Sequence, residues 1–173
     1  MLRALLCLVH HLVDLLPRLL LGFLSLLHFL LLDGRAGRRG GGGLGAAARK
    51  CDDRGASWRD VEIGRYSPMT YCRDVIVSPH DPRVMYACLS VHARGEDGSL
   101  YRSEDAGRTW RRFDHGVKAH GTMMAVAAHP LDPARVYCVS RCGQVFGTED
   151  AGASWREYPL PEGVQDVYTV ACA

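Results

Sequence analysis

The sequence carries almost no net charge and few aromatic side chains. Its 173 residues hold 21 Lys and Arg against 19 Asp and Glu, and aromatic residues make up 8% of the chain. Residues 51–173 are mildly acidic, because seven of the basic residues but only two of the acidic ones fall within residues 1–50. A surface that binds nucleic acid needs a basic excess. We therefore expect no nucleic-acid partner.

Metal and nucleotide signatures are absent as well. Seven cysteines occur without any C-x-x-C pair, and no second Cys/His cluster has the spacing of a zinc site. The glycine run 40–43 is not followed by Gly-Lys-Ser/Thr, which a phosphate-binding loop requires. Four cysteines lie in apolar, strand-like runs, which favours reduced, buried thiols and a cytoplasmic location. We expect no metal ion and no cofactor.

The N-terminus lacks a clean membrane-spanning run. Residues 1–33 are rich in leucine and are expected to be helical or disordered. The longest run without an acid or a base other than histidine is the fourteen residues Leu19–Leu32. A spanning helix needs about 20 apolar residues. Residues 34–50 form a Gly/Arg/Ala-rich linker. Two interpretations stay open for residues 1–33: a signal or membrane anchor, which implies export or membrane attachment, and a misassigned start.

After residue 50 there is no sustained 3.6-residue apolar period, and an internal repeat takes its place. The pattern Ser/Thr-x-Asp-x-Gly-x-Ser/Thr-Trp occurs at 51–58, 103–110 and 148–155, with Cys51 as the only departure. The Asp can bond backbone amides two residues on, the Gly supplies a positive φ, and the Trp packs on a neighbouring sheet. Each copy therefore predicts a hairpin turn. The residues assigned to these structural turns are Asp53, Gly55, Trp58, Ser103, Asp105, Gly107, Trp110, Thr148, Asp150, Gly152 and Trp155.

A second motif repeats out of phase with the first. The segments 77–86 and 128–137 both contain an Asp-Pro pair, and their tyrosines are 51 residues apart. Each Asp-Pro pair predicts a turn between two strands. About four short strands per period of 45–52 residues is typical of propeller blades. The strands expected between the turns are 72–78, 84–91, 99–103, 123–128, 135–140, 144–148 and 166–172.

The three copies of the first motif resemble the Asp-box, or BNR, repeats of sialidase-like, sortilin-like and photosystem II assembly factor-like propellers. The stretches 65–74 and 141–148 are most similar to bacterial BNR-repeat proteins described as glycosyl-hydrolase-like. This resemblance covers about 120 residues and implies a fold rather than one activity. It implies an all-β partial propeller of about two to three four-stranded blades over 51–173. Because a closed propeller has at least four blades, we interpret the chain as part of a longer propeller, with self-association as the alternative.

In propellers the first strand of each blade lines the central channel, where ligands bind. The segments expected there are 71–77, 122–127 and 165–170. Buried charges are costly unless paired, so polar residues at these positions indicate a polar ligand or ion. The alternative is a structural Arg73–Asp74–Asp166 network that fills the channel. The ligand-binding candidates are Tyr71, Arg73, Asp74, Arg141, Gln165 and Asp166.

No catalytic constellation accompanies the repeats. Sialidases, which the repeats resemble, use an arginine cluster and a tyrosine–glutamate pair, and their Phe/Tyr-Arg-Ile-Pro element is missing here. Other glycosidases need two carboxylates about 5–10 Å apart, for which Asp74 or Glu162 could be paired with Asp166. We expect a non-catalytic module that binds or assembles with a polar small molecule, a glycan or a protein. The alternative is a glycosidase or sialidase-like hydrolase acting on a carbohydrate at the channel.

Overall fold

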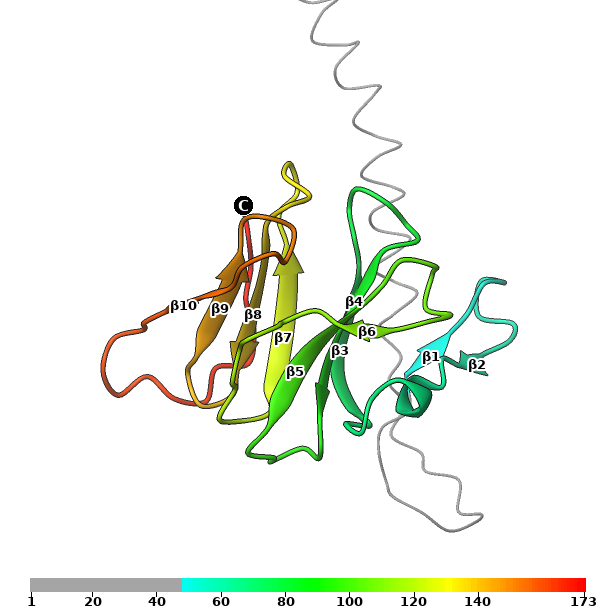
Figure 1. The fold of residues 1–173 in the computed structure, drawn as a ribbon. Coiled ribbons are helices and arrows are strands. Elements are labelled where there is room, and N and C mark those ends of the chain that lie inside the picture. Colours follow the sequence, from blue (N-terminus) through cyan, green and yellow to red (C-terminus); the bar gives the residue numbers. More distant parts are fainter. Residues whose placement is uncertain (1–47) are drawn as a thin grey trace, which may run out of the picture.

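The computed structural model describes residues 48–173, which form three antiparallel sheets (Figure 1). A two-stranded sheet pairs β1 (Arg49–Lys50) with β2 (Arg59–Asp60), and a 3-10 turn at Ile63–Arg65 follows. The first four-stranded sheet contains β3 (Tyr71–Val77), β4 (Met85–Ser90), β5 (Gly98–Ser103) and β6 (Arg111–Arg112). The second contains β7 (Met123–Ala128), β8 (Val136–Ser140), β9 (Val145–Thr148) and β10 (Arg156–Tyr158). The predicted all-β partial propeller of two to three blades is confirmed.

Each four-stranded sheet is a meander in which strands adjacent in sequence are paired, in the orders β3-β4-β5-β6 and β7-β8-β9-β10. The two blades share one irregularity: a bulge interrupts the register between Cys72 and Asp74 in β3 and between Met123 and Ala125 in β7. The first six of the seven expected strands all form, and none of their ends is displaced by more than one residue. The repeat in the sequence is therefore a repeat in the backbone.

One expected strand is absent. Residues 166–172 form no strand, because none of the described strands pairs with them. Val167 and Val170 still pack against a small cluster of Met124, Ala125 and Val139 on the second blade. The alternating valines therefore give this segment a buried side, but a ladder of backbone hydrogen bonds needs a neighbour that the described residues do not supply.

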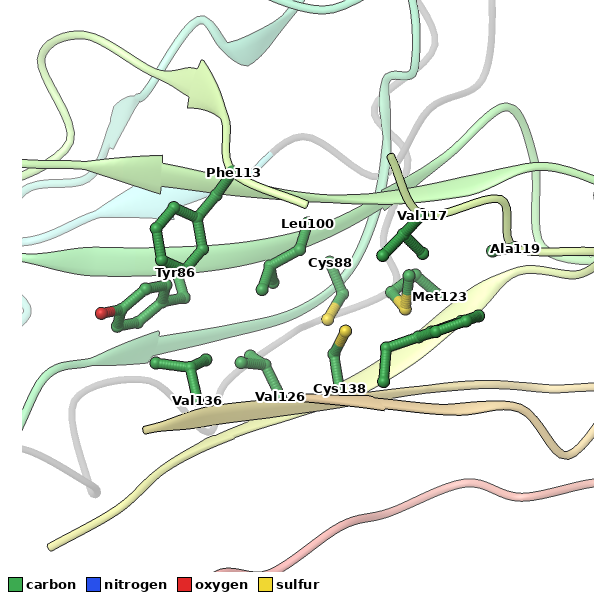
Figure 2. Packing of buried hydrophobic residues seen from close by; sticks show 11 residues of the cluster. Tyr86, Cys88, Leu100, Phe113, Val117, Ala119, Met123, Val126, Val136 and Cys138 are labelled. Atoms are coloured by element: carbon green, nitrogen blue, oxygen red, sulfur yellow. The ribbon is translucent and has the colours of Figure 1, made fainter. Parts of the chain in front are cut away.

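The main core lies between the two four-stranded sheets (Figure 2). Alternate residues of each strand point into it, as the two-residue period of a strand requires. Tyr86 and Cys88 of β4 face Val136 and Cys138 of β8, and the two thiols point toward one another without a disulfide. Burial raises the pKa of both thiols well above the usual value. These cysteines act as small apolar side chains of the core.

All three Asp-box motifs fold as the predicted turns between paired strands, β1–β2, β5–β6 and β9–β10. Asp105 accepts hydrogen bonds from the amides of Arg108 and Thr109 and from the Thr109 hydroxyl, so its bonds reach three and four residues on, rather than two. Ser103 Oγ accepts from the Gly107 amide at 2.8 Å. In the first copy the Cys51 thiol takes this serine position and accepts from the Gly55 amide. The glycines have φ of +92°, +81° and +92°, in the left-handed region.

The Asp-box turns also hold neighbouring blades together. Trp155 packs edge-on against Phe113 of the preceding blade, with 5.5 Å between ring centroids, and Nε1 donates to the Phe113 carbonyl at 3.1 Å. Trp110 is buried in the equivalent place, in a cluster that includes Val61. Trp58 is 41% exposed, because none of the described sheets covers it. Packing of the Asp-box Trp on the preceding blade is thus observed twice.

The predicted apolar segment 1–33 and most of the predicted linker, residues 34–47, lie outside the described residues. β1 begins at Arg49, inside the range expected for the linker. Between residues 48 and 173, no helix is long and apolar enough to cross a membrane.

Candidate functional site

The ends of each blade differ in composition. The Asp-Pro and Asp-box turns lie at one end, since they join β3 to β4 and β5 to β6 in the first blade and the equivalent strands in the second. The connections 91–97, 113–122 and 141–144 lie at the opposite end, because neighbouring strands are antiparallel. Polar side chains from these connections and from residues 159–166 meet there. We call this the loop end.

Two predicted site residues are brought together at the loop end. Arg141 Nε lies 3.1 Å from Asp166 Oδ1, and the two side chains are 30% and 60% exposed. The hydrogen bond from Arg141 to Asp166 raises the pKa of the guanidinium. The Arg141 backbone also accepts from the Val167 amide and donates to the Thr122 carbonyl, so it fixes the C-terminal segment beside β7. The pair is accessible to a ligand on one side and anchored on the other.

Thr122 is a buried polar residue that the sequence interpretation placed on an inner strand without giving its side chain a role. Its Oγ1 accepts from the Gly95 amide at 3.0 Å and donates to the His92 carbonyl at 3.2 Å. The Thr122 side chain therefore joins the β4–β5 loop of the first blade to the start of β7. Its backbone contact with Arg141 extends this connection to the β8–β9 loop.

Gln144 is a second loop-end residue that the sequence did not single out. Its Oε1 accepts from the His120 amide at 2.7 Å, and its Nε2 donates to Glu157 Oε1 at 3.4 Å. The thiol of Cys142 also donates to Oε1, at 3.3 Å. One side chain thus connects β10 and the β6–β7 connection to the β8–β9 loop. Side-chain hydrogen bonds therefore connect the segments that form the loop end.

The other predicted site residues lie apart from the Arg141–Asp166 pair. Asp74 Oδ2 accepts from the Val126 amide of the next blade at 3.0 Å, and burial raises the pKa of this carboxyl although the amide bonds oppose the shift. Arg73 and Gln165 are exposed, and Tyr71 is half-buried. Arg73 forms no ion pair within residues 48–173, and Asp166 is bound to Arg141. The expected Arg73–Asp74–Asp166 network is therefore wrong, because Asp74 bonds backbone instead.

A third carboxyl group, that of Asp114, is completely buried and was not predicted from the sequence. Ser99 Oγ donates to its Oδ1 at 2.6 Å and Arg112 Nε donates to the same atom at 2.9 Å, whereas Oδ2 has no partner. Burial raises the pKa of Asp114, and the bonds from Ser99 and Arg112 act in the opposite direction. This group holds the β6–β7 connection on β5 and has no exposed surface for a ligand.

The Asp-box carboxylates are held in their turns. Hydrogen bonds from the hydroxyl and amide of Ser154 lower the pKa of Asp150 to about 2. Hydrogen bonds from Cys51, the larger cause, and from Ser57 lower the pKa of Asp53 to about 2 as well. Slight burial raises the pKa of Asp105, but hydrogen bonds from Thr109 and Ser103 outweigh it and lower this pKa to about 2. Within the described part of the chain, no three His, Cys, Asp or Glu residues are grouped to hold a metal ion.

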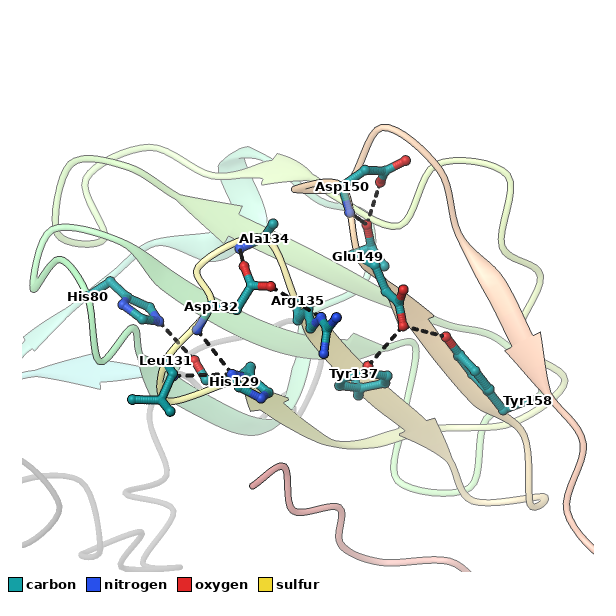
Figure 3. A network of polar contacts seen from close by, with 11 residues as sticks. His80, His129, Leu131, Asp132, Ala134, Arg135, Tyr137, Glu149, Asp150 and Tyr158 are labelled. Atoms are coloured by element: carbon teal, nitrogen blue, oxygen red, sulfur yellow. Dashed lines mark hydrogen bonds and ion pairs between the residues drawn. The ribbon is translucent and has the colours of Figure 1, made fainter.

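The outward face of the second blade carries Tyr137 and Tyr158, and Figure 3 shows Glu149 between their hydroxyl groups. The Tyr137 and Tyr158 rings lie 6.0 Å apart, and both hydroxyls reach Glu149 Oε1 at 3.5 Å. A pocket of about 230 Å³ beside them is lined by Gly147, Glu149, Asp150, Ser154, Arg156 and Tyr158. The nearby Asp-Pro turn is capped by His129, whose Nδ1 accepts from two amides, and His80 of the first blade bonds the His129 carbonyl.

Comparison with known proteins gives one family match and several structural ones. The family model described as sortilin, neurotensin receptor 3, matches residues 98–171. No curated protein sequence matches the chain. The GH74 enzyme of Niastella koreensis matches with a TM-score of 0.50 and 16% identity, over 63% of this chain and 17% of that one. The GH74 xyloglucanase of Xanthomonas campestris matches with a TM-score of 0.50 and 21% identity, over 64% of this chain and 17% of that one.

YCF48 bound to D1 peptide is a weaker match, with a TM-score of 0.40, 18% identity and coverage of 62% of this chain and 36% of that one. The chain covers 17% of each of the two GH74 structures, which is about one sixth of their length. These two matches, the sortilin match and the three Asp-box turns agree on the fold. Residues 48–173 fold as consecutive blades of a partial β-propeller whose hairpin turns are Asp-box, or BNR-type, motifs.

Proposed function

We propose that the chain is a non-catalytic propeller module for binding or assembly, with its ligand contacts at the loop end. The observation that carries this proposal is that the predicted site carboxylates and the Asp-box carboxylates all bond other groups of the chain. Asp74 is bonded to the Val126 amide, Asp166 to Arg141, and the Asp-box acids to their own turns. Each has a structural partner, which supports binding rather than acid–base chemistry.

A glycosidase needs one carboxyl group with a raised pKa and one ionised group, both facing the same accessible space. Among the described residues the pKa is raised for the carboxyl groups of Asp74, which is half-buried at a blade junction, and Asp114, which is completely buried. Asp166 is exposed and paired with a cation, and Glu162 is exposed. Within residues 48–173 the required pair of carboxyl groups does not face one open site. The carbohydrate hydrolase is therefore the weaker proposal.

The loop end suits a polar ligand. Arg141 and Asp166 together offer one cation and one anion that are already desolvated in part, and exchanging their mutual contact for a ligand removes little packing. The ligand class is a polar small molecule, a glycan or a protein segment with hydrogen-bonding groups. The bonds of Thr122 and Gln144 keep the surrounding loops fixed, which reduces the entropy lost on binding.

The test uses the full chain on arrays of glycans and peptides and in a hydrolysis assay with xyloglucan, the polysaccharide that the Xanthomonas neighbour is named for. We expect array binding that Arg141→Ala removes and Arg83→Ala keeps, since Arg83 is an exposed arginine paired with Asp81 in the Asp-Pro turn, at the end opposite the loop end. We expect no release of reducing ends. Release that is lost in Asp166→Asn, or array binding insensitive to Arg141→Ala, contradicts the proposal.

A further inference from the structure

The two blade junctions within the chain have the same construction. The residue three positions after the Asp-box Trp lies under the Asp-box turn of the next blade: Val61 under the turn of Gly107, and Phe113 under the turn of Gly152. A Cβ atom on Gly152 would overlap the Phe113 ring, and one on Gly107 would lie 3.8 Å from Val61. Each junction thus combines one Asp-box turn with one apolar residue of the blade before it.

One turn and one such apolar position remain unused among the described residues. The unused turn is the first, in which a Cβ on Gly55 would meet no atom within 4 Å and Trp58 is 41% exposed. The unused position is Tyr158, three residues after Trp155 on the outward face of β10. These two elements lie at opposite sides of the described blades, on the first and the last hairpin (Figure 1).

The geometry around Tyr158 repeats the geometry that receives a turn in the preceding blade. The Tyr137 and Tyr158 rings lie 6.0 Å apart at 55°, and the Tyr86 and Phe113 rings lie 5.5 Å apart at 51°. In the first blade Trp155 packs on Phe113, whereas in the second blade Tyr158 lines the 230 Å³ pocket. Figure 3 shows Tyr137 and Tyr158 near Glu149. The aromatic pair of the second blade is therefore preformed to receive an Asp-box turn.

Charge complements the shape at this place. In the first blade the Arg102 guanidinium lies 5.2 Å from the Phe113 ring centroid. Gly147 takes the equivalent position in the second blade, and the missing side chain leaves room for the pocket. Glu149 borders the pocket and forms no ion pair within residues 48–173. Arg54, next to Gly55 in the unused turn, is exposed and likewise forms no ion pair there. A docked first turn would bring this cation toward the pocket, whose lining has two carboxylates, Glu149 and Asp150, and one cation, Arg156.

We propose that a second copy of this chain docks its first Asp-box turn, Gly55–Trp58, on the Tyr137–Tyr158 face of the first copy. The interface is head-to-tail, so each copy uses two different surfaces and the assembly extends or closes into a ring. It buries Trp58 and covers the half-buried Tyr137–Tyr158 pair in the manner of the internal junction. This surface is separate from the loop end, so the inference goes beyond the proposed ligand binding.

The experiment measures the mass of the full chain in solution over a concentration series. We expect association that increases with concentration in the wild type. Trp58→Ala and Tyr158→Ala, each at the centre of one surface, should weaken it at least about tenfold. Leu131→Ala is the matched control, because Leu131 is 86% exposed on an Asp-Pro turn outside both surfaces, and it should associate as the wild type does.

Mixing the variants separates head-to-tail docking from other modes. Trp58→Ala keeps an intact Tyr158 surface, and Tyr158→Ala keeps an intact Trp58 turn. An equimolar mixture should therefore form dimers and nothing larger, which also shows that both variants are folded. A wild type that stays monomeric at all concentrations overturns the proposal. So does a Trp58→Ala variant that associates like the wild type, or a mixture without dimers.

Discussion

The indole of Trp155 donates its Nε1 hydrogen to the Phe113 carbonyl and meets the Phe113 ring edge-on, at 87° between the ring planes. This single contact combines a hydrogen bond, an aromatic pair and the closure of one side of the core between two blades. Trp58 occupies the same place in its own motif and has no such neighbour among the described residues. Comparing Trp155 with Trp58 therefore isolates the contribution of the blade junction to stability.

Trp155→Ala should lower the free energy of unfolding by about 2–4 kcal/mol, somewhat below the loss for a fully buried tryptophan. Trp58→Ala should lower it by less than about 1 kcal/mol, because a side chain that is 41% exposed gives up little packing. Denaturant unfolding of dilute protein, where self-association is minimal, measures both. Equal losses in the two variants would show that the blade junction does not stabilise the fold.

The Asp-box glycines give a second matched comparison. Gly55 and Gly152 both have φ of +92°, so alanine brings the same backbone strain of about 1 kcal/mol at either site. Only at Gly152 would the new methyl group overlap the Phe113 ring. We expect Gly152→Ala to destabilise the chain by about 1–3 kcal/mol more than Gly55→Ala does. Similar melting temperatures for the two variants would contradict the close approach seen at the junction.

The Asp-box carboxylates make the stability of the folded chain depend on pH in the acidic range. Because their pKa values are about 2 in the folded chain and 3.8 is ordinary for Asp, the folded state binds protons less readily. The stabilisation is complete above about pH 4 and is lost as pH falls toward 2. Ser154→Ala removes the largest cause of the shift at Asp150, so it should flatten the pH dependence of the melting temperature over this range. Thr169→Ala, an exposed substitution outside the turns, should leave the slope unchanged.

Asp74 is expected to behave in the opposite way. Burial raises its pKa, so the folded chain binds this proton more tightly than the unfolded chain does, and the ionised group destabilises the fold at neutral pH. Asp74→Asn keeps an acceptor for the Val126 amide without a charge. The variant should unfold at the same or a higher denaturant concentration than the wild type at pH 7, and this advantage should vanish near pH 4.

The alanine variant at this position separates the charge from the hydrogen bond. Asp74→Ala leaves the Val126 amide without its acceptor, so it should be less stable by about 1–3 kcal/mol at pH 7. If Asp74→Asn is instead clearly less stable than the wild type at pH 7, the charge itself stabilises the junction, and desolvation is not the dominant effect at Asp74.

The repeated turns could be predicted from the sequence because their structure is local. Asp105, Gly107 and Thr109 lie within one five-residue span, and residue type alone indicates the bonds they form. The error concerned the reach of the Asp side chain, which bonds three and four residues on. The expected strand at 166–172 failed because alternation of valines signals a buried side, whereas a strand also needs a partner.

Site residues were harder to predict because their partners are distant in sequence. Arg141 and Asp166 were both selected, but the pairing across 25 residues depends on how the C-terminal segment lies beside β7. Asp74 was selected as a channel residue, and its actual partner is the Val126 amide, 52 residues away. Thr122 and Gln144 were missed, since a single threonine or glutamine carries no spacing signal.

The local reach of the Asp-box bonds has a consequence for the order of folding. The bonds of Ser103 and Asp105 close loops of at most four residues, whereas the contact of Trp155 with Phe113 spans 42 residues. Short loops close in roughly 10–100 ns, long before distant segments meet. The three turns can therefore form early and independently, each starting a hairpin, and we expect the docking of one blade on the next to be the slower step.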